Sequence, residues 1–136
     1  MSDLEEPALL TIDLAAIVAN YRLLAAQAPA AELAPAVKAD AYGLGMAKVA
    51  PALAAAGARR FFVAWLAEGI ALRALLPDAV IHVLNGLEPG RAGLYRAHRL
   101  IPCLDSLEAI REWVEGGGGP AVLHLDTGIS RLGMPP

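Results

Sequence analysis

The sequence has little of several features that mark common classes of protein. It contains one cysteine, Cys103, so an internal disulfide is impossible and a reducing compartment is expected. Its eleven lysines and arginines are outnumbered by fourteen aspartates and glutamates, which leaves a net charge of −3. This balance argues against a nucleic-acid partner, because such a surface needs concentrated positive charge.

Long uncharged apolar runs are also missing. No run approaches the ~20 residues that span a bilayer, and the acidic start MSDLEEP is unlike the basic beginning of a signal peptide. No G-x-G-x-x-G opens a helix, which counts against a dinucleotide-binding fold. His82 and His98, two of the three histidines, lack metal-ligand spacing with other donors, so no metal site is expected. These absences predict a cytoplasmic protein that has neither a membrane nor a nucleic-acid partner.

Apolar residues, in contrast, make up 57% of the chain and recur in a regular order. Strand-like runs begin near residues 36, 61, 81, 100 and 121, and segments with helical periodicity lie between them. This alternation predicts βαβ units and a parallel sheet in an α/β fold. The continuous runs FFVAW, IHVL, LIPCL and AVLHL are typical of strands buried on both faces. Periodicity by itself leaves a closed barrel and an open doubly wound sheet both possible.

Two helix starts can be predicted from capping residues. Residues 9–13, LLTID, are expected to form a short strand, after which Asp13 caps a helix that Pro29 ends. Asp105 and Glu108 resemble a capping box for a helix over residues 106–115. The glycines at 116–119 then end that helix.

The stretch AVKADAYGLG, residues 36–45, concentrates residues that can do chemistry. Lys38 stands where an apolar strand gives way to a loop, and desolvation there favours the neutral, nucleophilic amine. Tyr42 and the backbone around Gly43 and Gly45 can hold an anion such as a phosphate, because glycine allows close approach of backbone N–H groups. The ordinary alternative is a solvated lysine at the end of a strand.

The same stretch resembles the pyridoxal-phosphate lysine motif of alanine racemases, which reads close to AVVKADAYGHG. A second string, HLDTGISRLGM over residues 124–134, is similar to the DTGMxRLG motif of that family. The two motifs stand in the expected order and at about the expected distance. Two positions depart from the family pattern: Leu44 replaces a histidine, and His124 replaces a lysine that is often carbamylated and positions the motif arginine.

The resemblance implies a partial (β/α)₈ barrel of the TIM type, with about five of its eight strands present. A short N-terminal strand and helix would precede these strands. Residues 1–136 would form the N-terminal portion of the barrel domain that binds the cofactor, without the C-terminal β-domain. Half a barrel is expected to be poorly soluble by itself, because it leaves raw sheet edges.

The resemblance also implies an activity and a site. The cofactor would be pyridoxal 5′-phosphate, and a homodimer would interconvert L-alanine and D-alanine to supply D-alanine for peptidoglycan. Lys38 would form the Schiff base with the cofactor and act as a catalytic base. Tyr42 would help to hold the cofactor phosphate, and Arg131 would reach the phenolic oxygen of the cofactor and the substrate carboxylate. The fragment alone is expected to be inactive, because the second catalytic base belongs to an absent domain.

Two other functions stay open. The chain can belong to a serine or broad-specificity amino-acid racemase of the same fold, because most residues that select the substrate side chain lie beyond Pro136. It can also be a non-catalytic module that binds pyridoxal phosphate, and Leu44 and His124 keep that alternative open. Asp40 and Asp126 are expected to organise the backbone near the strand ends, and the segment 61–75 is expected to serve core packing.

Overall fold

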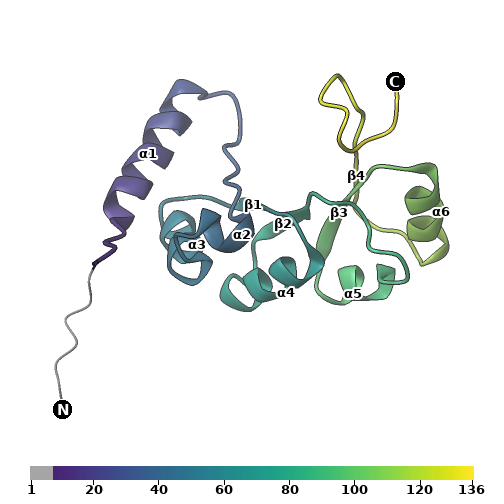
Figure 1. Cartoon of the computed structure of the whole chain (residues 1–136), viewed down its shortest axis with the longest axis horizontal. Helices are drawn as coiled ribbons and strands as arrows, with labels where there is room; N and C mark the ends of the chain where they lie inside the picture. The colour runs from purple at the N-terminus through teal and green to yellow at the C-terminus, as the bar shows by residue number, and fades with distance from the viewer. Residues whose placement is uncertain (1–7) are drawn as a thin grey trace, which may run out of the picture.

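A parallel sheet forms the centre of the computed structural model, which describes residues 8–136 (Figure 1). The acidic start MSDLEEP lies outside the described residues. The strands lie side by side in chain order: β1 (Arg60–Val63), β2 (Val80–Val83), β3 (Leu100–Leu104) and β4 (Val122–Leu123). All three pairings are parallel. The direction of the strands agrees with the sequence, and four of the five predicted strands form, whereas the run near residue 36 makes only an isolated bridge.

The run before Lys38 joins this sheet by a single bridge. Ala36 pairs in parallel with Phe62 of β1, and Val37 N donates to Phe62 O at 2.9 Å. This run therefore lies on the free edge of β1. Lys38 consequently begins its turn beside the end of β1, although the predicted strand before it is reduced to this single bridge.

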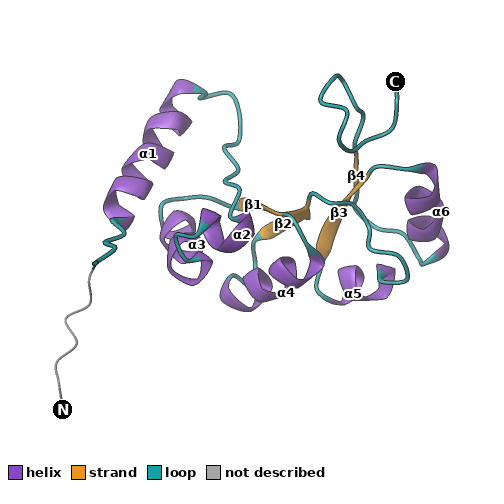
Figure 2. Cartoon of the chain, in the orientation of Figure 1, coloured by secondary structure: helices purple, strands orange, loops and turns teal. Residues whose placement is uncertain are grey.

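Within residues 8–136, six helices connect or precede the strands. They are α1 (Leu14–Gln27), α2 (Lys38–Tyr42), α3 (Met46–Ala55), α4 (Leu66–Leu75), α5 (Ala92–Ala97) and α6 (Leu107–Glu115). Figure 2 shows α3, α4 and α5 along one side of the sheet, whereas α1 stands outside it and packs beside α3. Within residues 8–136, no helix is both long enough and apolar enough to cross a membrane.

The core lies between the sheet and this layer of helices. Side chains alternate along each strand, so Phe61 and Val63 of β1 and Ile81 and Val83 of β2 point to the helices and are fully buried. Each side chain of this size stabilises the fold by about 1.5–3 kcal/mol on burial. The helices contribute the other half of the core: Val49, Leu53, Leu66, Leu72, Tyr95 and Trp113. Both residues of β4, Val122 and Leu123, are exposed at the far edge of the sheet.

Two predictions about local structure are wrong. Residues 9–13 form no strand: Leu9 and Leu10 are 90% and 77% exposed, and no strand within residues 8–136 pairs with them. A strand is stable only beside a partner, which an apolar run does not itself supply. The helix starting near residue 106 is capped by Ser106, whose Oγ accepts from Ala109 N at 3.2 Å, rather than by Asp105. The cap at Asp13 is confirmed, since its Oδ1 accepts from Ala15 N at 2.8 Å.

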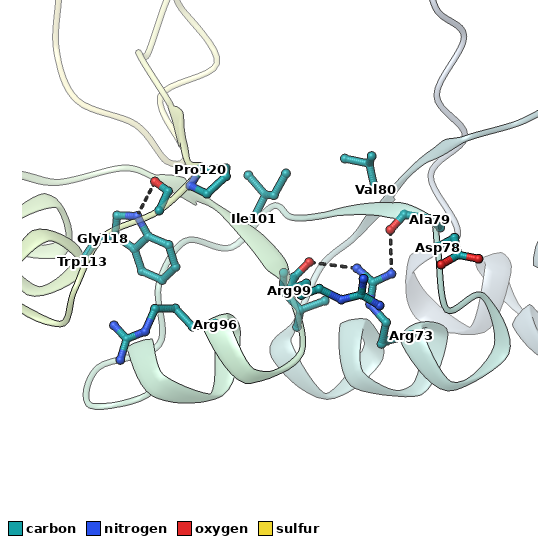
Figure 3. A pocket seen from close by; sticks show the side chains of 12 residues that line it. Arg73, Asp78, Ala79, Val80, Arg96, Arg99, Ile101, Trp113, Gly118 and Pro120 are labelled. Carbon is teal, nitrogen blue, oxygen red and sulfur yellow. Dashed lines mark hydrogen bonds between the residues drawn. The ribbon is translucent and has the colours of Figure 1, made fainter.

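The N-terminal ends of the strands surround a cavity of about 520 Å³ (Figure 3). Arg73 of α4 lies in it, and its guanidinium donates to five backbone carbonyls at 2.7–3.3 Å: His98, Leu76, Pro77, Ala79 and Arg99. Arg99 Nη2 donates to Pro77 O in turn. These bonds join the loops that precede β2 and β3. Both arginines therefore stabilise the loops before β2 and β3, and they lie at the end of the sheet opposite to Lys38.

Tyr95 of α5 is the largest fully buried side chain, and its hydroxyl donates to Gly86 O at 2.9 Å. Burial raises the pKa of Tyr95 to about 12 from its ordinary 10.0. As pH rises, the Tyr95 hydroxyl therefore loses its proton in the unfolded chain before it does so in the folded chain. The contribution of Tyr95 to folding stability is complete below pH 10 and is lost as pH rises towards 12. We expect Tyr95→Phe to lower the unfolding free energy by about 1–2 kcal/mol at pH 8, because the buried Gly86 carbonyl loses its donor. Urea unfolding at pH 8 and pH 11 measures both effects.

The control for this prediction is Tyr21→Phe on α1, where the ring is half-buried and its hydroxyl makes no hydrogen bond within residues 8–136. It should change the unfolding free energy by less than about 0.5 kcal/mol. Equal losses for the two variants would contradict the role given to the Tyr95 hydroxyl.

Candidate active site

The chain makes a left-handed turn immediately after Lys38. Ala39, Asp40, Ala41 and Tyr42 have φ angles of 50°, 52°, 54° and 57°. L-residues lose about 1–2 kcal/mol each in this conformation, and only glycine adopts it freely. Strain of this kind persists where surrounding contacts hold it, and it is concentrated at functional sites. The sequence predicted a special loop here from Gly43 and Gly45, but not that the four residues before them share the conformation.

Hydrogen bonds within the turn hold it closed. Ala41 N donates to Val37 O at 3.0 Å, Gly43 N to Ala39 O at 2.9 Å, and Gly45 N to Asp40 O at 2.9 Å. Asp40 Oδ1 also accepts from Met46 N, the first residue of α3, at 2.7 Å. Asp40 therefore organises the backbone at this end of the sheet, as the sequence predicted.

One further side chain, Glu68 of α4, contacts the turn from outside. Its Oε1 accepts from Ala39 N at 2.7 Å, and its Oε2 accepts from Ala64 N at 2.7 Å and from Trp65 N at 3.1 Å. Sequence reasoning missed this residue, because the segment 61–75 was assigned to core packing. An acidic residue in the first turn of a helix signals a cap, but no sequence pattern reveals its reach to Ala39.

The second motif forms a closed loop after β4. Met134 N donates to His124 O at 2.9 Å, and Asp126 N donates to Met134 O at 2.8 Å, so the two ends of the loop pair. Asp126 Oδ1 accepts from Gly128 N at 3.0 Å and from Ser130 N at 2.8 Å. These two bonds hold the pKa of Asp126 below its ordinary value. Asp126 thereby shapes the loop that carries Arg131, which agrees with the expectation from the sequence.

Gly133 makes this closure possible. Its φ is 105°, and a Cβ at this position would lie 2.8 Å from Asp126 N and 3.0 Å from the His124 ring. His124 is half-buried, and it lines a small cavity of about 80 Å³ together with Arg131. The histidine therefore lies in the neighbourhood of the motif arginine, where many family members have lysine.

Lys38 and Arg131 line the same open cavity, of about 450 Å³, although they come from opposite ends of the chain. Ala64 and Trp65, which follow β1, and Asn85, which follows β2, complete its wall together with Leu132. The cavity therefore lies at the carboxyl ends of the strands, where parallel α/β folds bind their ligands. Two cationic groups and an amide suit a small anionic ligand, and the Lys38 amine can in addition attack a carbonyl.

The third predicted site residue, Tyr42, lies beside Lys38 without lining this cavity. Its ring centroid is 5.9 Å from Lys38 Nζ, and the side chain is 63% exposed. Leu44, which stands where the family has histidine, is 40% exposed. The structure thus brings Lys38 and Arg131 to one cavity and leaves Tyr42 outside its lining.

Residues 12–136 match the family model described as alanine racemase, N-terminal domain. The chain belongs to this family. The alanine racemase of Methylobacterium nodulans is 54% identical over 132 residues, which cover 93% of this chain and 36% of that relative. The chain thus spans about a third of the length of the curated relatives it matches.

Solved alanine racemases share the fold. The crystal structure of the Bartonella henselae enzyme, which has covalently bound pyridoxal phosphate, superposes with a TM-score of 0.84 at 43% identity. The match covers 90% of this chain and 36% of that one. The histidine racemase of Leuconostoc mesenteroides matches at 29% identity with a TM-score of 0.77, over 88% of this chain and 34% of that one. The α/β class and the partial barrel predicted from the sequence are therefore confirmed.

Proposed function

We propose that these residues belong to an alanine racemase, which interconverts L-alanine and D-alanine with pyridoxal 5′-phosphate. The observation that carries the proposal is the shared cavity of Lys38 and Arg131 at the carboxyl ends of the strands, in a chain of the alanine racemase family. A cytoplasmic enzyme that supplies D-alanine for peptidoglycan follows from this assignment. Residues 1–136 then form the N-terminal portion of its cofactor-binding barrel.

The chemistry of the cavity fits this cofactor. Bound pyridoxal phosphate supplies an electron sink that makes the α-proton of an amino acid removable. Lys38 Nζ would hold the aldehyde carbon of the cofactor, and the same amine would take or return the α-proton on one face of the substrate. The Arg131 guanidinium would pair with the substrate carboxylate and the phenolic oxygen of the cofactor, since its planar donors match such oxygens. The Tyr42 hydroxyl would donate to the cofactor phosphate.

The opposite face of the α-carbon needs a second base. Residues 8–136 offer no second lysine or tyrosine on the cavity that Lys38 and Arg131 share. We therefore assign the second base to a partner subunit in a homodimer, and we expect the 136 residues alone to racemise alanine little or not at all. Substantial turnover by this chain in isolation would contradict the assignment.

A different amino-acid substrate is the second candidate. The likeness to a histidine racemase favours it, because the same fold there acts on another side chain. A serine or broad-specificity racemase belongs to the same class. A module that binds pyridoxal phosphate without turnover is the third candidate, supported by Leu44 and His124 at two positions of the family motifs.

One experiment separates these candidates. The protein, at the length that its source cells make, is incubated with pyridoxal phosphate and assayed on L-alanine, L-serine, L-lysine and L-histidine. In parallel, borohydride fixes the cofactor to its lysine, and peptide mapping locates it. Fastest turnover of alanine with capture at Lys38 supports the proposal, and a faster rate on another amino acid supports the second candidate. Capture without turnover indicates the binding module, and absence of capture at Lys38 contradicts all three.

A further inference from the structure

We propose that Glu68 is a positioning residue for Lys38. Its carboxylate ties the turn that follows the lysine to the beginning of α4, and so sets the direction in which the amine enters the cavity. The inference rests on the proposed function, because it concerns the group that would hold the cofactor.

The two oxygens of Glu68 have separate partners. Oε2 accepts from Ala64 N and Trp65 N, which closes the first turn of its own helix. Oε1 accepts from Ala39 N at 2.7 Å, across 29 positions of sequence. A carboxylate acceptor strengthens such bonds, and bonds of 2.7 Å are typical of charged partners. Glu68 thus links the helix start, the end of β1 and the lysine turn through one side chain.

The Ala39 amide depends on this contact. The bonds that close the turn use the amides of Ala41, Gly43 and Gly45, and none of them uses the amide of Ala39. Within residues 8–136, Glu68 is the acceptor for Ala39 N. Without it, the Ala39 amide loses its acceptor, and fewer bonds hold the left-handed strain that begins at Ala39. A shift of the backbone at Ala39 displaces the Cα of Lys38, which is bonded to the same peptide group, and so displaces the amine relative to the cavity.

The simpler alternative is that Glu68 only caps α4. Glu68→Asp separates the two roles, because the shorter side chain keeps a charge at the helix start but retracts from Ala39. Glu68→Gln keeps the reach and removes the charge. Glu88→Gln is the matched control: Glu88 Oε1 accepts from Leu66 N, the first residue of α4, at 3.2 Å, and makes no bond to the lysine turn.

The sequence supplies an internal reference for lysine reactivity. Residues 1–136 contain two lysines, Lys38 and the exposed Lys48 on α3. The protein at its native length is treated with pyridoxal 5′-phosphate and borohydride, and mapping gives the ratio of labelled Lys38 to labelled Lys48. Hydrogen exchange of the Ala39 amide is measured on the same variants, and circular dichroism verifies that each is folded.

We expect Glu68→Asp to lower the Lys38:Lys48 labelling ratio about tenfold, the equivalent of one charge-assisted hydrogen bond. Glu68→Gln should lower it less, and Glu88→Gln should leave it within about twofold of the wild type, since Glu88 caps the same helix but makes no bond to the lysine turn. Exchange at Ala39 should accelerate in the two Glu68 variants and not in the control.

Several results would overturn the inference. An unchanged labelling ratio in folded Glu68→Asp shows that Glu68 only caps its helix. If the Glu68 variants do not fold, the wild type decides by itself: an Ala39 amide that exchanges freely while the Gly43 amide is protected rules out the tether. A wild type that does not prefer Lys38 over Lys48 contradicts the proposed function instead, and exchange at Ala39 then still tests the tether.

Discussion

Replacing Lys38 by alanine should abolish capture of pyridoxal phosphate at this position and lower kcat for alanine racemisation by at least about 10³-fold in the protein at its native length. The reason is chemical: no other amine lines the cavity within the described part of the chain. Lys38→Arg should be equally inactive although it keeps the positive charge, because a guanidinium does not condense with an aldehyde. Spectrophotometry of bound cofactor and a coupled racemase assay measure the two effects.

The control for Lys38 is Lys48→Ala, which removes an exposed lysine of α3. It should leave kcat within about twofold, as surface substitutions usually do. Because the cavity is open, methylamine should restore part of the lost rate in Lys38→Ala and none in Lys38→Arg, whose side chain still fills the position. Activity of Lys38→Ala within tenfold of the wild type would be incompatible with the proposed role.

Gly133→Ala is the second substitution with a large expected effect. The new methyl group would lie 2.8 Å from Asp126 N and 3.0 Å from the His124 ring, so the loop that carries Arg131 must shift. Because a misplacement of about 1 Å can reduce rates about 10²-fold, we expect a loss of that order in kcat/KM for alanine. The loss should fall mainly on KM, since Arg131 is proposed to bind the substrate carboxylate. Capture of cofactor at Lys38 should persist.

The control variant Gly128→Ala distinguishes the steric collision at position 133 from the backbone strain of an alanine at positive φ. Gly128 has a φ of 133° in the same loop, yet a Cβ there meets nothing within 4 Å. Both variants carry the strain of an L-residue at positive φ, and only Gly133→Ala adds the collision. Similar kcat/KM values for the two would show that the closure at Gly133 does not position Arg131.

The fold could be predicted to a large extent from the sequence. The strand runs from Phe61, Ile81 and Leu100 form three strands of the sheet, and the run from Ala121 forms the fourth, because continuous apolar runs between helices have few alternatives to a buried parallel sheet. The helix after Asp13 begins where its cap predicted, since capping is decided within a few residues. Prediction failed at residues 9–13, because a strand needs a partner that lies elsewhere in space.

The candidate site was predictable in part. Lys38, Tyr42 and Arg131 were selected by motifs, and their roles stay predictions until the experiments above are done. The shared cavity of Lys38 and Arg131 follows from the rule that parallel strands end on one edge of the sheet. Glu68 was not predictable, because its contact with Ala39 joins two segments whose spacing carries no signal.

The sequence by itself determined which residues can do chemistry, which runs become strands and where several helices begin. These properties depend on side-chain type and on neighbours within one turn or one strand. Only the tertiary structure decided the left-handed turn after Lys38, the tether from Glu68 and the closure of the Arg131 loop at Gly133. Each of these depends on backbone groups that the packing of distant segments brings within hydrogen-bonding or van der Waals distance.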